Sequence, residues 1–156
     1  MSGSFSSKIF TNANQEIVEY KGEPVYWRVS AYAIIFRDQK VLLIKNKSEK
    51  LYDVPGGGVD LGETIHQALE RELMEEAGAS AKIGKLLHVQ EGFFKHANGS
   101  FFQTIQLFYQ AELTGELVTP TESTSEYVGF VSLNECIKYP LPKGATAAIS
   151  TIQGEA

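Results

Sequence analysis

The stretch GGVDLGETIHQALERELMEEAGA, residues Gly57–Ala79, joins a glycine-rich loop to a helix and indicates most about the fold. Thr64 is predicted to begin the helix, because Thr64-x-x-Gln67 is a capping-box pattern. Gly78 stands where a helix is expected to end. The apolar residues of this helix recur on one face, which predicts that it packs on a sheet. They are Ile65, Leu69, Leu73 and Ala77.

The C-terminal half of this helix concentrates carboxylates where they are unfavourable. Glu72, Glu75 and Glu76 repel one another by roughly 0.2–0.5 kcal/mol per pair, and the helix dipole disfavours negative charge at that end. At about 100° per residue, the three side chains project within an arc of about 100°, and Arg71 lies on its far side. Two interpretations remain: a solvated acidic face with Glu–Arg pairs, or a set of hard oxygen ligands for a divalent cation.

The segments around this helix predict a mixed sheet. Pro24–Phe36 and VLLIK are expected to form two strands joined by the turn RDQK, and Asn98-Gly99 favours a hairpin between two later strands. The glycine-rich loop DVPGGGVDLGE is not expected to be regular structure. The later elements are strands at 81–94 and 101–113, the strand EYVGFVSL, a helical turn at NECIK and a terminal helix at KGATAAISTIQ. This order predicts the α/β (α+β) class, with helices packed on the sheet.

Composition limits the classes of function. A chain of 156 residues, 43% of them apolar, is expected to form one domain over residues 8–156, preceded by a flexible tail at residues 1–7. The net charge of −5 argues against a nucleic-acid polymer as partner. No membrane span or secretory leader is expected. Cys136 is the single cysteine and is predicted to be a packing residue, which fits a cytoplasmic protein.

The helix and the loop before it together resemble the Nudix box. That pattern is Gly, five residues, Glu, seven residues, then Arg-Glu-(apolar)-x-Glu-Glu-x-Gly-(apolar). Gly57, Glu63 and Arg71 have this spacing, and Ala79 departs only in being smaller than the usual apolar residue. A P-loop is rejected, because Glu63 stands where a P-loop has the lysine that neutralises phosphate.

The resemblance implies a Nudix-type α/β/α sandwich with a mixed β-sheet. It also implies metal-dependent hydrolysis of the pyrophosphate bond in a nucleoside diphosphate linked to another group, X. A canonical or oxidised nucleoside triphosphate, split to monophosphate and pyrophosphate, is the expected substrate, with Mg²⁺ (or Mn²⁺) as cofactor. A nucleotide-sugar or ADP-ribose-type pyrophosphatase and a non-catalytic nucleotide sensor are the alternatives. The expected partner is this small nucleotide-like molecule, and a homodimer is left open.

The resemblance also assigns roles to the box. Glu72, Glu75 and Glu76 are expected to be metal ligands, with the carbonyl of Gly56 adding a further ligand. Arg71 is expected to orient the box through a pair with Glu63. Eight helical residues would separate the two by about 12 Å, so this pair requires Glu63 to lie in the loop and fold back.

The rest of the site is less sharply defined. Gly56, Gly57 and Gly58 are expected to let the backbone approach phosphate, and Arg28 on the first long strand is a candidate substrate-binding residue. Relatives draw a catalytic glutamate from a loop before a late strand, where Glu126 is favoured over Glu122. The general base is left open among Glu72, Glu122 and Glu126. The motifs that mark particular substrates in this family are absent, so the group X is not identified.

Overall fold

The computed structural model describes residues 5–122, 125–136 and 138–154 of the chain. In these residues a mixed sheet runs in the order β2-β1-β6-β7-β3-β4-β8, and β5 pairs with β3 beside this path. Its strands are β1 (Phe10–Thr11), β2 (Ile17–Val18), β3 (Val25–Arg37), β4 (Lys40–Asn46), β5 (Gly56–Gly58), β6 (Ala81–Lys95), β7 (Phe101–Leu113) and β8 (Ser125–Ser132). The helical segments are α1 (Ile65–Glu72), η1 (Leu73–Ala77), α2 (Leu133–Cys136) and α3 (Lys143–Gly154).

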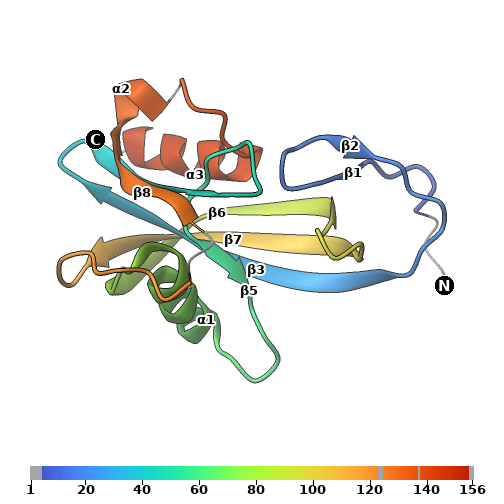
Figure 1. The fold of residues 1–156 in the computed structure, drawn as a ribbon, viewed down its shortest axis with the longest axis horizontal. Coiled ribbons are helices and arrows are strands. Elements are labelled where there is room, and N and C mark those ends of the chain that lie inside the picture. The colour runs from blue at the N-terminus through green and yellow to red at the C-terminus, as the bar shows by residue number, and fades with distance from the viewer. Residues whose placement is uncertain (1–4, 123–124, 137, 155–156) are drawn as a thin grey trace.

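Helices cover both faces of the sheet, as Figure 1 shows for α1 and α3. Side chains alternate along β3, so Ile35 packs toward α1 while Ile34 packs toward α3. The first of the two cores includes Leu69 and Leu73 from the glutamate helix, and the second includes Ala148 from the terminal helix. The predicted α+β class with a mixed sheet is confirmed, and the apolar stripe of α1 packs as expected.

The sheet opens between its two central strands. β3 runs parallel to β7 along most of its length, but it pairs with β4 only at Phe36↔Val41 and Arg37↔Lys40. β4 then turns away and pairs with β8. The segment after β4 enters this opening, because Asp53 bridges to Ile44 on one side while Ala33 donates to the carbonyl of Pro55 on the other.

The glycine-rich loop is partly regular, which corrects the prediction. Gly56–Gly58 form β5, antiparallel to residues Ser30–Tyr32 of β3. The glycines are needed for this close approach: Gly56 has φ +153°, and a Cβ on it would lie 2.2 Å from the carbonyl oxygen of Ala31. Local composition predicted a loop because the pairing strand lies more than twenty residues earlier in the chain.

The local signals in the sequence are confirmed. Thr64 and Gln67 form the capping box, Gly78 ends the helix with φ 60°, and Gly99 lies in the β6–β7 turn with φ 92°. Cys136 is buried in the core under α3. No helix in the described segments is long and apolar enough to cross a membrane.

The N-terminal hairpin β1–β2 was not predicted. Figure 1 shows it beside β6, and β1 pairs in parallel with β6 at Thr11↔Phe94. Phe5, from the expected tail, has its ring 6.5 Å from that of Phe10 and 6.3 Å from that of Phe93. Residues 1–4 of that tail lie outside the described residues, and the boundary of the domain at residue 8 stays a prediction.

Candidate functional site

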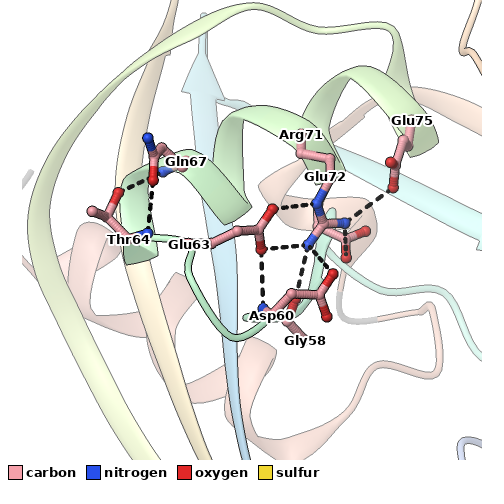
Figure 2. A network of polar contacts seen from close by, with 8 residues as sticks. All are labelled: Gly58, Asp60, Glu63, Thr64, Gln67, Arg71, Glu72 and Glu75. Carbon is pink, nitrogen blue, oxygen red and sulfur yellow. Dashed lines mark hydrogen bonds and ion pairs between the residues drawn. The ribbon is translucent and has the colours of Figure 1, made fainter.

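Arg71 is the centre of a polar network between the helix and the loop before it (Figure 2). Its guanidinium donates to Glu63 at 2.7 and 2.9 Å, to Glu72 at 2.9 Å and to Glu75 at 3.2 Å. It also donates to the carbonyl of Gly58 at 3.0 Å. The positive charge of Arg71 therefore offsets much of the repulsion among these carboxylates. Its pairs with Glu72 and Glu75 are those expected from the first interpretation, a solvated acidic face with Glu–Arg pairs.

The Glu63–Arg71 pair has the geometry that the resemblance requires. Glu63 precedes the N-cap Thr64 and folds back along the helix to Arg71, and its carboxylate also accepts from the backbone N–H of Asp60 at 3.0 Å. The hydrogen bonds from Arg71 lower the pKa of Glu63 to about 2. The loop is thus closed onto the helix by a carboxylate that stays ionised.

The glutamate helix widens at its C-terminal end, which the sequence did not reveal. Leu73–Ala77 form a π-helical segment, in which the backbone N–H of Gly78 reaches the carbonyl of Leu73. A wider turn rotates less per residue than 100°, so the directions projected for Glu75 and Glu76 shift. Arg71, which was projected next to Glu75 at the edge of the arc, contacts both Glu72 and Glu75.

Glu76 differs from its neighbours in having a backbone partner. Its carboxylate accepts a 3.0 Å hydrogen bond from the N–H of Gly56, and no ion pair to Glu76 is found in the described part of the chain. Burial raises the pKa of Glu76 to about 9, and the nearby charges of Glu72 and Asp53 add to this. Burial also raises the pKa of Glu72, against the opposing effect of Arg71. An ionised Glu76 therefore lacks a counter-charge.

The donor chemistry at this point fits a divalent cation. A Cβ on Gly57 would lie 2.5 Å from Oε1 of Glu72, so the glycine backbone, Glu72 and Glu76 share one small region. Their oxygens are the hard ligands that Mg²⁺ and Mn²⁺ prefer. Glu75 is turned toward Arg71, and no group of three or more Asp, Glu, His or Cys side chains among the described residues is already arranged to hold a metal. The ligands fit by type and burial, and Glu75 would have to leave Arg71 to join them.

The two candidate loop glutamates have different surroundings. Glu126, which the sequence analysis favoured, forms an ion pair with Lys45 of β4. Glu122 donates its backbone N–H to the carbonyl of Glu75 at 3.0 Å, and its charge contributes to the raised pKa of Glu72. The structure therefore brings Glu122 to the glutamate helix and gives Glu126 a separate partner.

A cavity of about 330 Å³ begins at these carboxylates and extends over the sheet. Glu72, Glu76 and Gly56 line one end, and Arg28 lines the cavity beside Gly58, whose Cβ would lie 2.7 Å from the Arg28 guanidinium. Arg28 has no ion pair in the described residues. A guanidinium without a carboxylate partner is a ready anion ligand.

Several cavity residues were missed from the sequence. Ser30, Thr104 and Gln106 lie side by side on the sheet floor, because Arg28↔Thr104 and Ser30↔Gln106 are paired between β3 and β7. Asp53 is partly buried at the opening of the sheet, and its loss of solvation there raises its pKa to about 7. The alternation of side chains along β3 and β7 indicated which residues of each strand share one face of the sheet. It did not predict that these two strands pair, so it could not place the three residues in one cavity.

Comparisons with known proteins agree on one family. The sequence model of the NUDIX domain matches residues 26–152. A candidate 8-oxo-dGTP diphosphatase of Bacillus subtilis is 38% identical over 77 residues, which cover 48% of this chain and 52% of that protein. An ADP-ribose pyrophosphatase of Methanocaldococcus jannaschii is 42% identical over 64 residues, covering 39% and 38%. The matched segments therefore span about half or less of these relatives.

A solved structure extends the likeness to the fold. The crystal structure of a MutT NUDIX hydrolase from Burkholderia pseudomallei superposes with a TM-score of 0.67 at 31% identity, covering 80% of this chain and 97% of that one.

Proposed function

Because the chain belongs to the NUDIX domain family, we propose that it hydrolyses the pyrophosphate bond of a nucleotide, with a nucleoside triphosphate as the substrate. Members of this family act on nucleotide-like molecules and generally use divalent metals. The observation that carries the proposal is the meeting of Glu72 and Glu76 with the glycine backbone at one end of a cavity. A canonical or oxidised triphosphate would give the nucleoside monophosphate and pyrophosphate.

The residues of the site would take three roles: binding the metal ion, positioning the helix against the loop, and contacting the phosphates. Glu72 and Glu76, with Glu75 and the carbonyl of Gly56, would hold Mg²⁺ or Mn²⁺. Such an ion neutralises charge on phosphate oxygens and acidifies water. Arg71 and Glu63 position this end of the helix against the loop. Arg28 and the backbone of Gly57 and Gly58 would contact the phosphates.

The chemical step needs a base as well as a charged cradle. Water adds to one phosphorus, the bridging P–O bond breaks, and the proton of the water passes to a carboxylate. Glu72 is the base candidate at the cavity wall, and Glu122 or Glu126 are the loop candidates. The leaving pyrophosphate takes the electron pair of the broken bond.

The test is a screen for product release with added Mg²⁺. Nucleoside triphosphates, including oxidised ones, are compared with nucleotide sugars, ADP-ribose and dinucleoside polyphosphates, and products are separated by chromatography. We expect monophosphate and pyrophosphate from a triphosphate, with activity abolished by excess EDTA. Full turnover in EDTA would contradict the metal assignment.

Two other results would change the function. Preferred hydrolysis of ADP-ribose, as in the Methanocaldococcus jannaschii relative, would favour the ADP-ribose-type alternative. Binding without turnover of any compound in the screen would favour a nucleotide sensor.

A further inference from the structure

The cavity has a second end, far from the carboxylates, to which the N-terminal hairpin contributes. Ala13 and Gln15, from the turn between β1 and β2, line it together with Phe94 and His96 of the β6 end. The family match begins at residue 26. The hairpin therefore precedes the segment that the family model matches.

The strand register separates the two ends. Tyr32 pairs with Gly56 at the carboxylate end, and four residues along β3 Arg28 pairs with Thr104. Gly92 and Phe94 of β6 continue across the sheet, opposite Thr104 and Phe102. Through Phe102, Phe94 is level with Tyr26, six residues along β3 from Tyr32. At about 3.3 Å per residue, the hairpin end therefore lies roughly 20 Å along the strand from the carboxylate end and two strands across, with Arg28 between the two ends.

The hairpin turn is ordered by its own hydrogen bonds. Asn12 accepts from the backbone of Asn14 and Glu16 through its side chain, and its carbonyl accepts from the N–H of Gln15. Gln15 has φ 60°, a conformation that non-glycine residues seldom adopt. The turn thus presents Gln15 in a defined position at the cavity.

Lys50, from the segment after β4, binds the β1–β2 turn to the opposite side of the cavity. The Lys50 ammonium lies 2.6 Å from Oε1 of Glu16, and the Lys50 backbone N–H donates to the side chain of Asn14 at 2.6 Å. Lys50 follows Glu49, which lines the cavity with Asn46. Figure 1 shows the turn of the hairpin pointing toward the segment that follows β4. The two walls of the cavity are therefore joined outside it.

From these contacts we infer that the β1–β2 hairpin, held by Lys50, encloses the nucleoside end of the substrate site and selects nucleotides that carry no second sugar or nucleoside beyond their phosphates. The inference rests on the proposed function. The phosphates occupy the carboxylate end beside Arg28, which leaves the base at Phe94, His96 and Gln15. Aromatic rings and amides suit a planar base with a hydrogen-bonding edge. About 330 Å³ is near the lower end of the range for ligand sites, roughly 300–1,000 Å³.

The test separates the hairpin from catalysis by measuring binding. Affinities of nucleoside monophosphates, pyrophosphate and ADP-ribose are measured by calorimetry for the parent, Lys50→Ala and Gln15→Gly. Glycine is at ease at a positive φ, so Gln15→Gly removes the side chain without straining the turn. Lys21→Ala is the matched control, because Lys21 forms an exposed ion pair with Glu19 on the same N-terminal segment.

We expect both hairpin variants to bind the preferred monophosphate about tenfold more weakly, with pyrophosphate affinity unchanged and Lys21→Ala like the parent. On the preferred triphosphate, KM should rise and kcat should stay within about twofold, the sign of lost uniform binding. The parent should prefer the monophosphate to ADP-ribose, and Lys50→Ala should narrow that preference.

Unchanged monophosphate affinity in both variants would overturn the inference. If the protein still hydrolyses a triphosphate, the proposed function would stand. A parent that binds no monophosphate, or binds ADP-ribose more tightly, would also overturn it. Weakened binding in the variants of a protein that turns over nothing would support the hairpin site and reject the hydrolase.

Discussion

At the scale of single residues, the glutamates of the helix fall into two electrostatic classes. Glu72 and Glu75 share Arg71 with Glu63, so their charges are offset within the protein. Among the residues that the structure describes, the Glu76 carboxylate has only the N–H of Gly56 as a hydrogen-bond partner, and its pKa is raised to about 9. Ionisation of a carboxylate without a counter-charge lowers the free energy of unfolding. This is what we expect of a metal ligand in the metal-free protein.

Replacing Glu76 with Gln should therefore stabilise the metal-free protein, by at least about 1 kcal/mol near pH 8. The amide oxygen can still accept from Gly56, and no charge is buried. Because the folded pKa lies above the unfolded one, the parent loses stability as pH rises from about 5 to about 9, and the advantage of the variant should grow over that window. Thermal melts in EDTA across this range measure it.

The same variant should lose most of its activity, because a ligand is gone. Added Mg²⁺ should raise the melting temperature of the parent more than that of Glu76→Gln, since binding stabilises the folded state that binds better. A variant clearly less stable than the parent without metal would show that Glu76 supports the fold, and the acidic helix would then be structural.

The two loop glutamates give a residue-scale test of the base. The structure places Glu122 against the glutamate helix and pairs Glu126 with Lys45. We therefore expect Glu122→Gln to slow kcat by about tenfold or more, which is about 1.4 kcal/mol, and Glu126→Gln to have the smaller effect. The reverse order would restore the preference drawn from the sequence, and equal small effects would leave Glu72 as the base candidate.

At the scale of elements, the π-helical turn and the glycine that ends it position the carboxylates. Gly78 has φ 60°, and a Cβ there would lie 1.8 Å from the carbonyl oxygen of Val118. The helix end is therefore pressed against the segment that leads to Glu122, whose backbone N–H bonds to Glu75. Functional π turns are often found where a helix must place a side chain off the α-helical spacing.

Gly78→Ala should be markedly more destabilising than Gly62→Ala, which serves as its control. Both positions have positive φ, so both variants carry a backbone cost of about 1–2 kcal/mol. Nothing lies within 4 Å of a Cβ at Gly62, whereas Gly78→Ala adds the clash with Val118, worth about 1–3 kcal/mol more. Urea unfolding of both variants measures the difference. Equal losses would show that the Val118 segment yields freely.

At the scale of the whole molecule, the sheet carries a separate core on each face, and only one supports the glutamate helix. Leu69 belongs to the α1 core and Leu43 to the α3 core, and both are fully buried. The position of Glu72 depends on the first core, because α1 is held to the sheet by its apolar stripe. A substitution in the α3 core should therefore lower stability alone, whereas one in the α1 core should also disturb the position of Glu72.

Leu69→Ala and Leu43→Ala should each cost about 2–5 kcal/mol of unfolding free energy. At a temperature where both variants are folded, Leu69→Ala should reduce kcat by about tenfold, while Leu43→Ala should stay within about threefold of the parent. Chemical unfolding and initial rates measure the two effects. Equal rates in the two variants would mean that the helix holds its place without Leu69.

The sequence by itself determined the features that depend on nearby residues: the capping box of Thr64 and Gln67, the helix end at Gly78, the Asn98-Gly99 turn and the spacing of the box. The resemblance to the Nudix box added the pair of Arg71 with Glu63, which helix geometry then required to form by a fold of the loop. Each of these rests on interactions within a few turns of chain, where residue type and spacing are sufficient.

Only the tertiary structure decided the pairing of Gly56–Gly58 with β3, the partial burial of Asp53, the partner of Glu126 and the contacts of Lys50 with the hairpin. These contacts join segments far apart in the chain, and they depend on which strands pair and where the sheet opens. The π turn belongs with them, because the widened helix is fitted between β5 and the Val118 segment. Contacts of this kind depend on how distant segments pack together, and the spacing of residues along the chain does not determine that packing.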